Sequence, residues 1–302
     1  MKSHSLHHAY LIMTHGNFAL LKRFLTFFDS ENIDFFIHVD AHVKAFDFEE
    51  FRTIPKWSSV TFVDRIRISW GDYSIVKCEM MLLKAAAKGH YDYYHLLSGV
   101  DVPVKTRVYI EHYFDADTTI NYINFQRTEI TKEHLDRVKY FYPFQRFNIR
   151  NKKVRNLLRK ATVAPQKLLR INRTKAFPTG YVFQKGTQWF SITDALAQYL
   201  VNLDESVLNR FRATLCPDEV FLHSIVMNSP FKDTLPPHAF NGEHSNCLRY
   251  IDWKRGNPYV FQDDDFDELT HTPENCLFAR KFDGKQTIAN RLYDYFSGEI
   301  KN

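Results

Sequence analysis

The amino-acid sequence predicts an α/β fold, in which helices cover both faces of a parallel sheet. Two short apolar runs that favour β structure, residues 8–14 and 34–39, flank residues 18–28, whose apolar side chains recur at helical spacing. A strand, a helix and a strand at this spacing indicate a βαβ unit, whose strands lie parallel. Ligands of such sheets bind beyond the carboxyl ends of the strands, so polar residues there are the first candidates for a site.

The composition is that of a globular protein with a substantial core. Of the 302 residues, 44% are hydrophobic and 25% are charged, which is ordinary for this class. No repeat or low-complexity linker divides the chain, so we expect one domain over residues 1–302. The net charge of +5 is compatible with an anionic ligand or surface. The four cysteines are far apart and form no C-x-x-C pair, which argues against a zinc site and gives no sign of a disulfide framework.

The sequence also bears on where the protein works. No apolar run is long enough for a membrane-spanning helix, and the run near the N-terminus is too short for a signal-peptide core. We therefore expect a cytoplasmic protein.

The first half continues the alternation of strands and helices. Residues 60–63 form a third candidate strand, and residues 73–88 carry their apolar side chains on one helical face. Residues 93–97 read as a further central strand, which runs into a small-residue turn with an acid, Asp101. A turn of this kind at the end of a strand is a place where a site would lie, although an acid such as Asp101 is by itself more often a turn former than a ligand.

Asp40 follows the second strand in the same way. It could hydrogen-bond a ribose or a base, or it could be an ordinary loop acid, and the residues alone do not decide between these interpretations.

Residues 146–175 contain eleven basic side chains and no acidic one. Val154, Leu157, Leu158 and Ala161 lie three or four positions apart within this segment, which predicts an amphipathic basic helix in part of it. Three interpretations remain open for the segment: a solvated face, a nucleic-acid patch, or a peripheral contact with an anionic membrane.

The second half resumes the globular pattern after Pro178. A helix is predicted near residues 194–203, and residues 246–253 alternate like a strand that carries Arg249 outward. The acidic run Asp263-Asp264-Asp265 precedes an apparent helix, so we interpret it as capping rather than as a metal site. Residues 277–282 lead into a short C-terminal helix.

The stretch TLCPDEVFLHSI, residues 214–225, carries two adjacent acids. Pro217 suits the first turn of a helix, where Asp218 and Glu219 would meet unsatisfied N–H groups. The apolar residues that follow recur at helical spacing. The start of a helix is therefore a sufficient explanation of the two acids, and this stretch by itself does not indicate a catalytic role.

Several common reaction classes lack their motifs. The sequence contains no G-x-x-x-x-G-K-[ST], no G-x-G-x-x-G, no H-E-x-x-H and no G-x-S-x-G. The carboxylate pair and the separated cations of the second half fit a transfer reaction, in which a base activates an acceptor and cations stabilise an anionic leaving group. Spacing alone does not prove this.

Six motifs in order give a more specific indication. They are WGDYSIV at 70–76, YYHLLSGVDVPVKT at 93–106, GTQWF at 186–190, CPDE at 216–219, LRYIDW at 248–253 and LFARKFD at 277–283. With this set the chain resembles the core-2/I-branching β-1,6-N-acetylglucosaminyltransferase family, which shares the motifs with protein xylosyltransferases and bacterial relatives. The resemblance covers nearly the whole chain, from about residue 9 to residue 283.

This resemblance implies a single GT-A-type, Rossmann-like domain with a mixed, mostly parallel sheet, and an inverting transfer from a UDP-sugar to an acceptor hydroxyl. Glu219 occupies the position of the family's catalytic base. No divalent metal is expected, because two basic side chains neutralise the UDP diphosphate in this family. By position these are Lys281 and Arg249, with Arg255 and Arg280 as competitors for the second place.

The same resemblance assigns the remaining site residues. Asp40, and less directly His15, are expected to contact the nucleotide, while motifs that line the donor and acceptor clefts contain Trp70, Ser98, Asp101, Trp189 and Trp253. Residues 1–125 would form the nucleotide-binding half and residues 176–302 the acceptor and catalytic half. The 146–175 segment would lie between them and associate with a membrane.

The expected donor is UDP-N-acetylglucosamine, with UDP-xylose as the alternative. The chain looks like a bacterial member that builds surface polysaccharide on a glycan or lipid-linked oligosaccharide at the inner face of the membrane, without nucleic acid as a partner. The alternative from another class is a non-catalytic protein that binds polysaccharide or a membrane surface through its aromatic and basic side chains.

Overall fold

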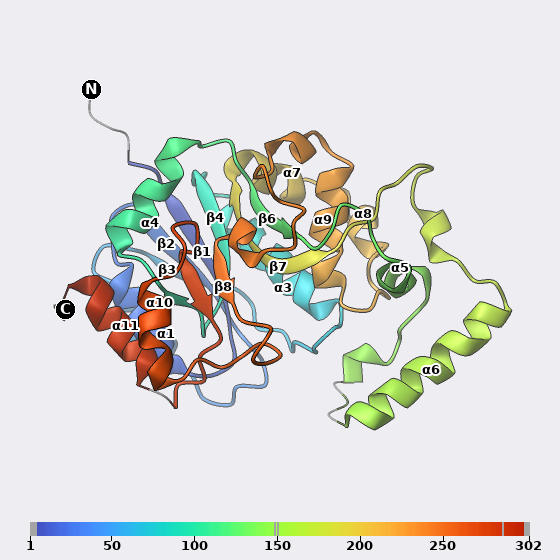
Figure 1. Cartoon of the computed structure of the whole chain (residues 1–302), viewed down its shortest axis with the longest axis horizontal. Coiled ribbons are helices and arrows are strands. Elements are labelled where there is room, and N and C mark those ends of the chain that lie inside the picture. The colour runs from blue at the N-terminus through green and yellow to red at the C-terminus, as the bar shows by residue number, and fades with distance from the viewer. Residues whose placement is uncertain (1–4, 148, 150, 286, 299–302) are drawn as a thin grey trace.

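A six-stranded sheet forms the centre of the computed structural model, which describes residues 5–147, 149, 151–285 and 287–298 (Figure 1). Its strand order is β3-β2-β1-β4-β7-β6. Neighbouring strands among the first four are parallel, whereas β7 runs antiparallel to both β4 and β6. The strands are β1 (His8–Thr14), β2 (Ile33–Val39), β3 (Val60–Phe62), β4 (Tyr93–Ser98), β6 (Tyr122–Phe125) and β7 (Gly186–Thr193).

A second, three-stranded sheet has the order β5-β9-β8. It comprises β5 (Val102–Pro103), β8 (Arg249–Ile251) and β9 (Phe278–Arg280), so it joins the segment after β4 to two C-terminal motifs. Strands β8 and β9 are parallel, and β5 is antiparallel to β9.

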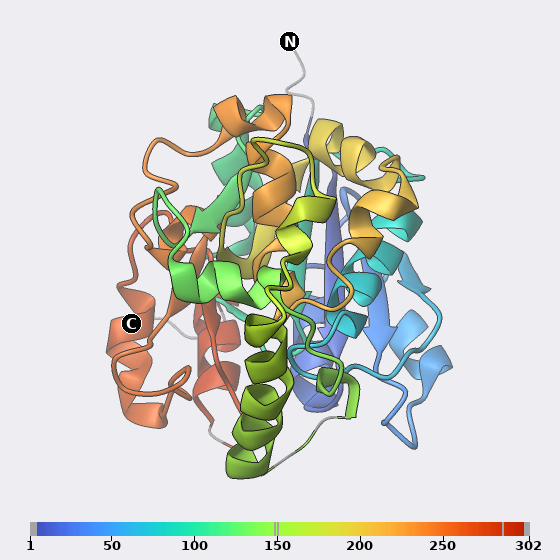
Figure 2. The same cartoon turned by 90° about the vertical axis from the view of Figure 1, so that its right-hand side faces the viewer.

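The helices pack in layers around these sheets (Figure 2). They are α1 (Phe18–Phe27), α2 (Phe48–Arg52), α3 (Ser74–Ala86), α4 (Arg107–Tyr113), α5 (Lys132–Lys139), α6 (Lys152–Leu168), α7 (Asp194–Val201), α8 (Glu205–Asn209), α9 (Phe221–Met227), α10 (Phe266–Thr270) and α11 (Ile288–Ser297). Among the described residues, no helix combines the length and the apolar character needed to cross a bilayer.

Alternation along the central strands divides the core into two clusters. In β1, Leu11 belongs to a cluster with side chains of α3, α7 and α9, whereas Ile12 belongs to one with side chains of α1, α11 and β9. Successive side chains of a strand point to opposite faces, so a strand that is apolar at every position is covered on both sides. The predicted α/β fold with a mixed, largely parallel sheet between helices is therefore confirmed.

The helix predicted from Pro217 is divided in two. Residues Pro217–Glu219 form a 3-10 turn, and α9 begins only after Val220, whose φ and ψ of −128° and −39° interrupt the helix. Cys216 enters the turn with a φ of 51°, and its N–H donates to the carbonyl of Gly71 at 3.0 Å. The turn is thus anchored to another loop at its start, and Glu219 lies at its end rather than in the first turn of an α-helix.

The acidic run at 263–265 caps helices, as predicted. It forms a 3-10 turn directly before α10, and Asp265 and Gln262 form a capping box there. Asp263 Oδ1 accepts hydrogen bonds from Thr287 Oγ1 and from the N–H of Ile288 at the start of α11. The carboxylates of Asp263 and Asp265 therefore accept hydrogen bonds that stabilise the starts of helices.

The prediction that Arg249 points outward is wrong. The side chain is fully buried, and its guanidinium donates to the carbonyls of Cys247, Leu96 and Phe190 at 2.7, 2.9 and 3.4 Å. It thus connects β8 to strands β4 and β7 of the central sheet. Alternation correctly indicated a strand, but it does not determine which of the two faces is buried.

Candidate active site

The carboxyl ends of the parallel strands and the beginning of β7 meet at one edge of the central sheet. Strands β1, β2 and β4 end there at Thr14, Val39 and Ser98. Because β7 is antiparallel to β4, its first residue, Gly186, lies at the same edge. Side chains of the loops that follow these strands, and of Lys185 just before β7, can therefore converge.

Glu219 lies at this edge between two cations. Its Oε2 is 2.8 Å from Nη1 of Arg137 in α5 and 3.1 Å from Nζ of Lys185. About a third of the Glu219 side chain, 32%, is exposed, compared with 21% for Arg137 and 14% for Lys185. Within the described residues, Oε1 receives no hydrogen bond, so one carboxylate oxygen is held and the other is available to a ligand.

The loop around Gly71 fixes the turn that presents Glu219. Gly71 has a φ of +75°, and a Cβ at this position would lie 3.3 Å from Cys216 Sγ. The N–H of Glu219 in turn donates to the carbonyl of Cys216 at 3.2 Å. Two of the sequence motifs, WGDYSIV and CPDE, thus meet in space to position one carboxylate.

The neighbouring acid, Asp218, faces the interior. It is 6% exposed, and its Oδ1 has no hydrogen-bond partner. Burial, followed by the nearby charge of Glu219, raises the pKa of Asp218, while burial and Asp218 raise the pKa of Glu79 in α3. These two carboxyl groups lie behind the turn and do not reach its surface.

The turn after β4 brings Asp101 towards Arg280. Asp101 Oδ2 accepts hydrogen bonds from the N–H and Oγ of Ser98 at 2.6 and 2.5 Å, which closes the turn. The other oxygen, Oδ1, lies 3.9 Å from Nε of Arg280, at the end of β9. The Arg280 guanidinium carbon lies 3.9 Å from the ring centroid of Trp189 in β7. Asp101, Trp189 and Arg280 therefore form one cluster, of which sequence analysis had named Arg280 only as a competitor.

The other basic candidates lie in different surroundings. Arg249, expected to hold a diphosphate, is buried and its Nη groups are bound to carbonyls, as described above. Arg255 forms ion pairs with Asp252, Asp265 and Glu268. Lys281 is half-buried next to Arg280, its backbone pairs with Tyr259 and Phe261, and in the described part of the chain its ammonium forms no ion pair.

The residues expected to contact a nucleotide lie at the same edge. Asp40 Oδ1 accepts from the N–H of His42 at 2.7 Å, and Oδ2 accepts from the N–H of Ile68 at 3.1 Å. Asp40 is 7% exposed, and these bonds join the loop after β2 to the loop after β3. His15 is exposed directly after β1.

His244 begins the 3-10 turn His244–Cys247 directly before β8, and sequence analysis did not identify it. Burial, with the positive charges of Lys185 and Arg280, lowers the pKa of His244 to about 4. Its ring centroid lies 6.0 Å from that of Trp253, a half-exposed indole. His244 precedes β8, and Arg280 lies in β9, the strand that pairs with β8.

Trp70, the remaining predicted aromatic residue, lies under α6. Its ring faces the guanidinium groups of Arg155 and Arg159, whose carbons are 5.0 and 5.8 Å from its centroid. The side chain is 56% exposed. The structure therefore places Trp70 at the junction between the WGDYSIV loop and the basic segment.

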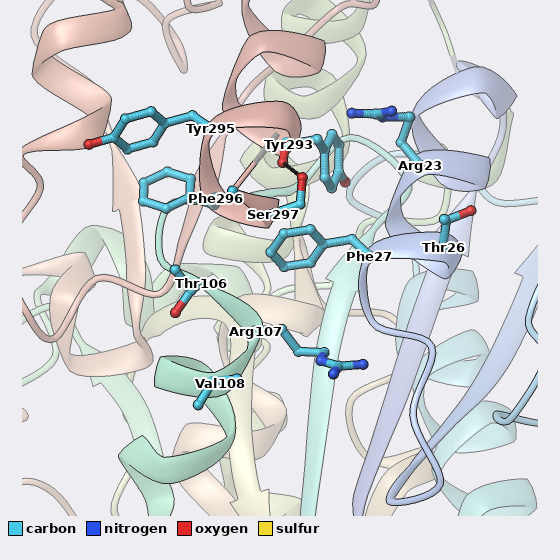
Figure 3. Close-up of a pocket in the computed structure, with 11 residues that line it drawn as sticks. Arg23, Thr26, Phe27, Thr106, Arg107, Val108, Tyr293, Tyr295, Phe296 and Ser297 are labelled. Carbon is cyan, nitrogen blue, oxygen red and sulfur yellow. Dashed lines mark hydrogen bonds between the residues drawn. The ribbon is translucent and has the colours of Figure 1, made fainter. Parts of the chain in front are cut away.

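A separate cavity of about 570 Å³ lies away from these residues (Figure 3). Phe27 of α1, Arg107 of α4 and Tyr293 of α11 are among the residues that line it, and its lining includes none of the predicted site residues. Neither there nor elsewhere in the described ranges do three or more His, Cys, Asp or Glu side chains form a group that could hold a metal ion.

Comparison with known proteins identifies related chains. Residues 8–271 match the family model described as Branch: Core-2/I-Branching enzyme. Xylosyltransferase 2 of Bos taurus is 25% identical over 96% of this chain and 33% of its own length. Xylosyltransferase 1 of Homo sapiens is 20% identical over 96% of this chain and 30% of its own length. The chain thus spans about a third of the length of these curated relatives.

Proposed function

The chain belongs to the core-2/I-branching enzyme family and is therefore a glycosyltransferase, and we propose that it transfers N-acetylglucosamine from UDP-N-acetylglucosamine to a glycan hydroxyl with inversion. The alternative donor is UDP-xylose, which the names of the xylosyltransferase relatives favour. The acceptor is a glycan or a lipid-linked oligosaccharide in bacterial surface polysaccharide synthesis.

The position of Glu219 carries this proposal. Its carboxylate is partly exposed at the edge where ligands of such sheets bind, and Arg137 and Lys185 hold it through Oε2. In the transfer, Oε1 takes the proton of the acceptor hydroxyl while the hydroxyl oxygen attacks the anomeric carbon. The bond from that carbon to the phosphate oxygen breaks, its electron pair leaves with UDP, and the configuration inverts. This is general base catalysis by a positioned carboxylate.

The diphosphate needs positive charge as the bond breaks, and we assign this task to Lys281 and Arg280. Arg280 replaces Arg249 in this role because its side chain, beside Asp101 and Trp189 at the end of β4, is still 12% exposed, whereas Arg249 is fully buried and bound to carbonyls. An arginine can bind two phosphate oxygens in a fork, and a lysine supplies a point charge. Two side-chain cations would then serve without a divalent metal.

The proposed function is tested by UDP release. Purified protein would be incubated with UDP-N-acetylglucosamine or UDP-xylose and a crude lipid-linked acceptor, with and without excess EDTA. We expect UDP release with at least one donor and the same rate in EDTA. If neither donor gave UDP release, the non-catalytic alternative would be favoured. Loss of activity in EDTA, with recovery on addition of manganese, would overturn the metal-independent mechanism.

A further inference from the structure

Helix α6 has its polar face towards the protein. Arg155 and Arg159 lie over Trp70, and the side chain of Gln166 exchanges hydrogen bonds of 2.8 and 2.9 Å with the backbone of Phe141. A surface helix of a globular protein normally buries its apolar stripe instead. Figures 1 and 2 show α6 extending away from the central sheet, so the arrangement leaves its other side open.

The outer face of α6 is apolar. Val154, Leu157 and Leu168 are 45%, 67% and 84% exposed. Together with the exposed Ala161 and Ala164 they follow a spacing of three and four residues, so they form one continuous stripe. The stripe lies nearly opposite the face that holds Arg155 and Arg159, as the helical period of 3.6 residues requires.

Basic side chains border this stripe. Lys153, Lys160 and Lys167 recur every seven residues, which aligns them along one flank. Lys153 and Lys160 are exposed, whereas Lys167 forms an ion pair with Asp136 at 3.8 Å. No acidic residue occurs between positions 146 and 175. Further exposed apolar side chains, Phe144 and Phe147, precede the helix, and Arg150 of the same segment lies outside the described residues.

We propose that the outer face of α6 docks on an anionic lipid bilayer. An apolar stripe bordered by lysines is the pattern of a helix that lies in a membrane interface, where the stripe enters the acyl boundary and the lysines contact anionic headgroups. A second copy of this face is a poorer partner, because its lysines would meet lysines with no acid of the segment to neutralise them. The positive charge of this face therefore favours an anionic bilayer over a second copy of the chain as its binding partner.

The docked helix would lie beside the candidate active site. Arg159 Nη2 donates to Gln145 Oε1 at 3.0 Å, and Ser69 Oγ donates to the carbonyl of Arg146 at 3.0 Å. Ser69 belongs to the loop that holds the turn of Glu219 through Gly71 and Cys216. A bilayer on α6 would thus face the loops that present Glu219. This contact goes beyond the proposed function and does not depend on catalysis.

Vesicle flotation tests the proposal. The full chain would be mixed with vesicles of phosphatidylcholine alone, or with about 30% phosphatidylglycerol to supply negative surface charge. We expect binding only to the anionic vesicles and weaker binding at high salt. Lys153→Ser/Lys160→Ser should reduce the affinity by roughly fivefold for each lysine removed, and Leu157→Ser/Leu168→Ser by about tenfold or more.

Matched control variants distinguish the contribution of this face to vesicle binding from general effects of charge and hydrophobicity. Lys84→Ser/Lys88→Ser removes exposed lysines elsewhere, and Val108→Ser removes an apolar side chain that is 56% exposed; neither change should alter vesicle binding. Wild-type protein that does not float with anionic vesicles would overturn the proposal. So would light scattering that shows a lipid-free dimer, if Leu157→Ser/Leu168→Ser converts it to monomer, because the occupant would then be a second copy.

Discussion

Arg249 and Arg280 lie on neighbouring strands of the three-stranded sheet, but we assign a structural role to the first and a ligand-binding role to the second. The guanidinium of Arg249 binds carbonyls of β4, of β7 and of Cys247 in the turn before β8, whereas that of Arg280 faces Asp101 and Trp189 at the end of β4. Loss of Arg249 leaves buried carbonyl groups without partners, which costs stability. Loss of Arg280 removes a charge from the region that we assign to the diphosphate.

Substitution of Arg280 should therefore mainly affect UDP binding, and substitution of Arg249 should mainly affect stability. Arg280→Ala should weaken UDP binding by about 10-fold to 100-fold, the usual effect of losing a charged hydrogen bond, and should lower the melting temperature less than Arg249→Ala does. Arg249→Ala should lower the free energy of unfolding by several kcal/mol, roughly 3 or more. Calorimetric titration with UDP and thermal unfolding measure the two effects. The reverse pattern would return the diphosphate to Arg249.

Glu79 gives the fold a dependence on pH. Burial, followed by the charge of Asp218, raises the pKa of Glu79. A carboxyl group whose folded-state pKa exceeds its unfolded value of about 4.3 stabilises the fold fully below that value, and the contribution is lost as pH rises towards the folded pKa. Glu79→Gln imitates the protonated form and should therefore gain stability relative to wild type as the pH increases.

Denaturant unfolding at pH 5 and pH 8 measures this effect. The stability of Glu79→Gln relative to wild type should increase by at least about 1 kcal/mol between the two pH values, since one unit of pKa shift corresponds to about 1.4 kcal/mol. The exposed Glu31→Gln serves as control and should show no such change. A constant difference between Glu79→Gln and wild type would mean that Glu79 titrates normally.

At the scale of elements, the start of β7 is closely packed against β6. A Cβ on Gly186 would lie 1.7 Å from the carbonyl oxygen of Asn124 and 2.4 Å from Nε2 of the buried His223. The backbone of β6 cannot move aside without breaking its pairing with β7. This glycine therefore permits the close approach that brings Lys185, the preceding residue, to Glu219.

Gly186→Ala should destabilise the protein by about 3 kcal/mol or more, because overpacking against backbone is rarely relieved. Gly16→Ala is the matched control, since a Cβ there meets nothing within 4 Å, and it should change stability by less than about 0.5 kcal/mol. Chemical denaturation compares the two variants. Equal stabilities would show that β6 and β7 can separate at this point without cost.

Local patterns predicted most of the elements correctly. Strands β1, β2 and β4 and helices α1 and α3 were evident because continuous apolar runs and helical spacing are strong local signals. The break in the helix at Val220 was not evident from the sequence. We attribute it to the backbone hydrogen bond between Cys216 and Gly71, two residues that are distant in sequence. The face of α6 that contacts the protein was also unpredictable, since its polar residues find partners in Trp70 and Phe141.

At the scale of the whole molecule, the candidate site combines motifs from all parts of the chain. Glu219 was predictable from the family motif, but its partner Arg137 is 82 positions away and carries no signal of its own. Lys185 directly precedes the GTQWF motif, so its place at the sheet edge could have been inferred from the antiparallel pairing of β7.

The central claim is that Glu219 is the general base, and Glu219→Gln tests it most directly. Sugar transfer and UDP binding would be measured on wild type, on this variant and on Glu205→Gln, which alters an exposed carboxylate in α8. We predict that Glu219→Gln binds UDP as wild type does but transfers sugar at least about 100-fold more slowly, while Glu205→Gln retains both properties. Near-normal transfer by Glu219→Gln would contradict the assignment and remove this carboxylate from the mechanism.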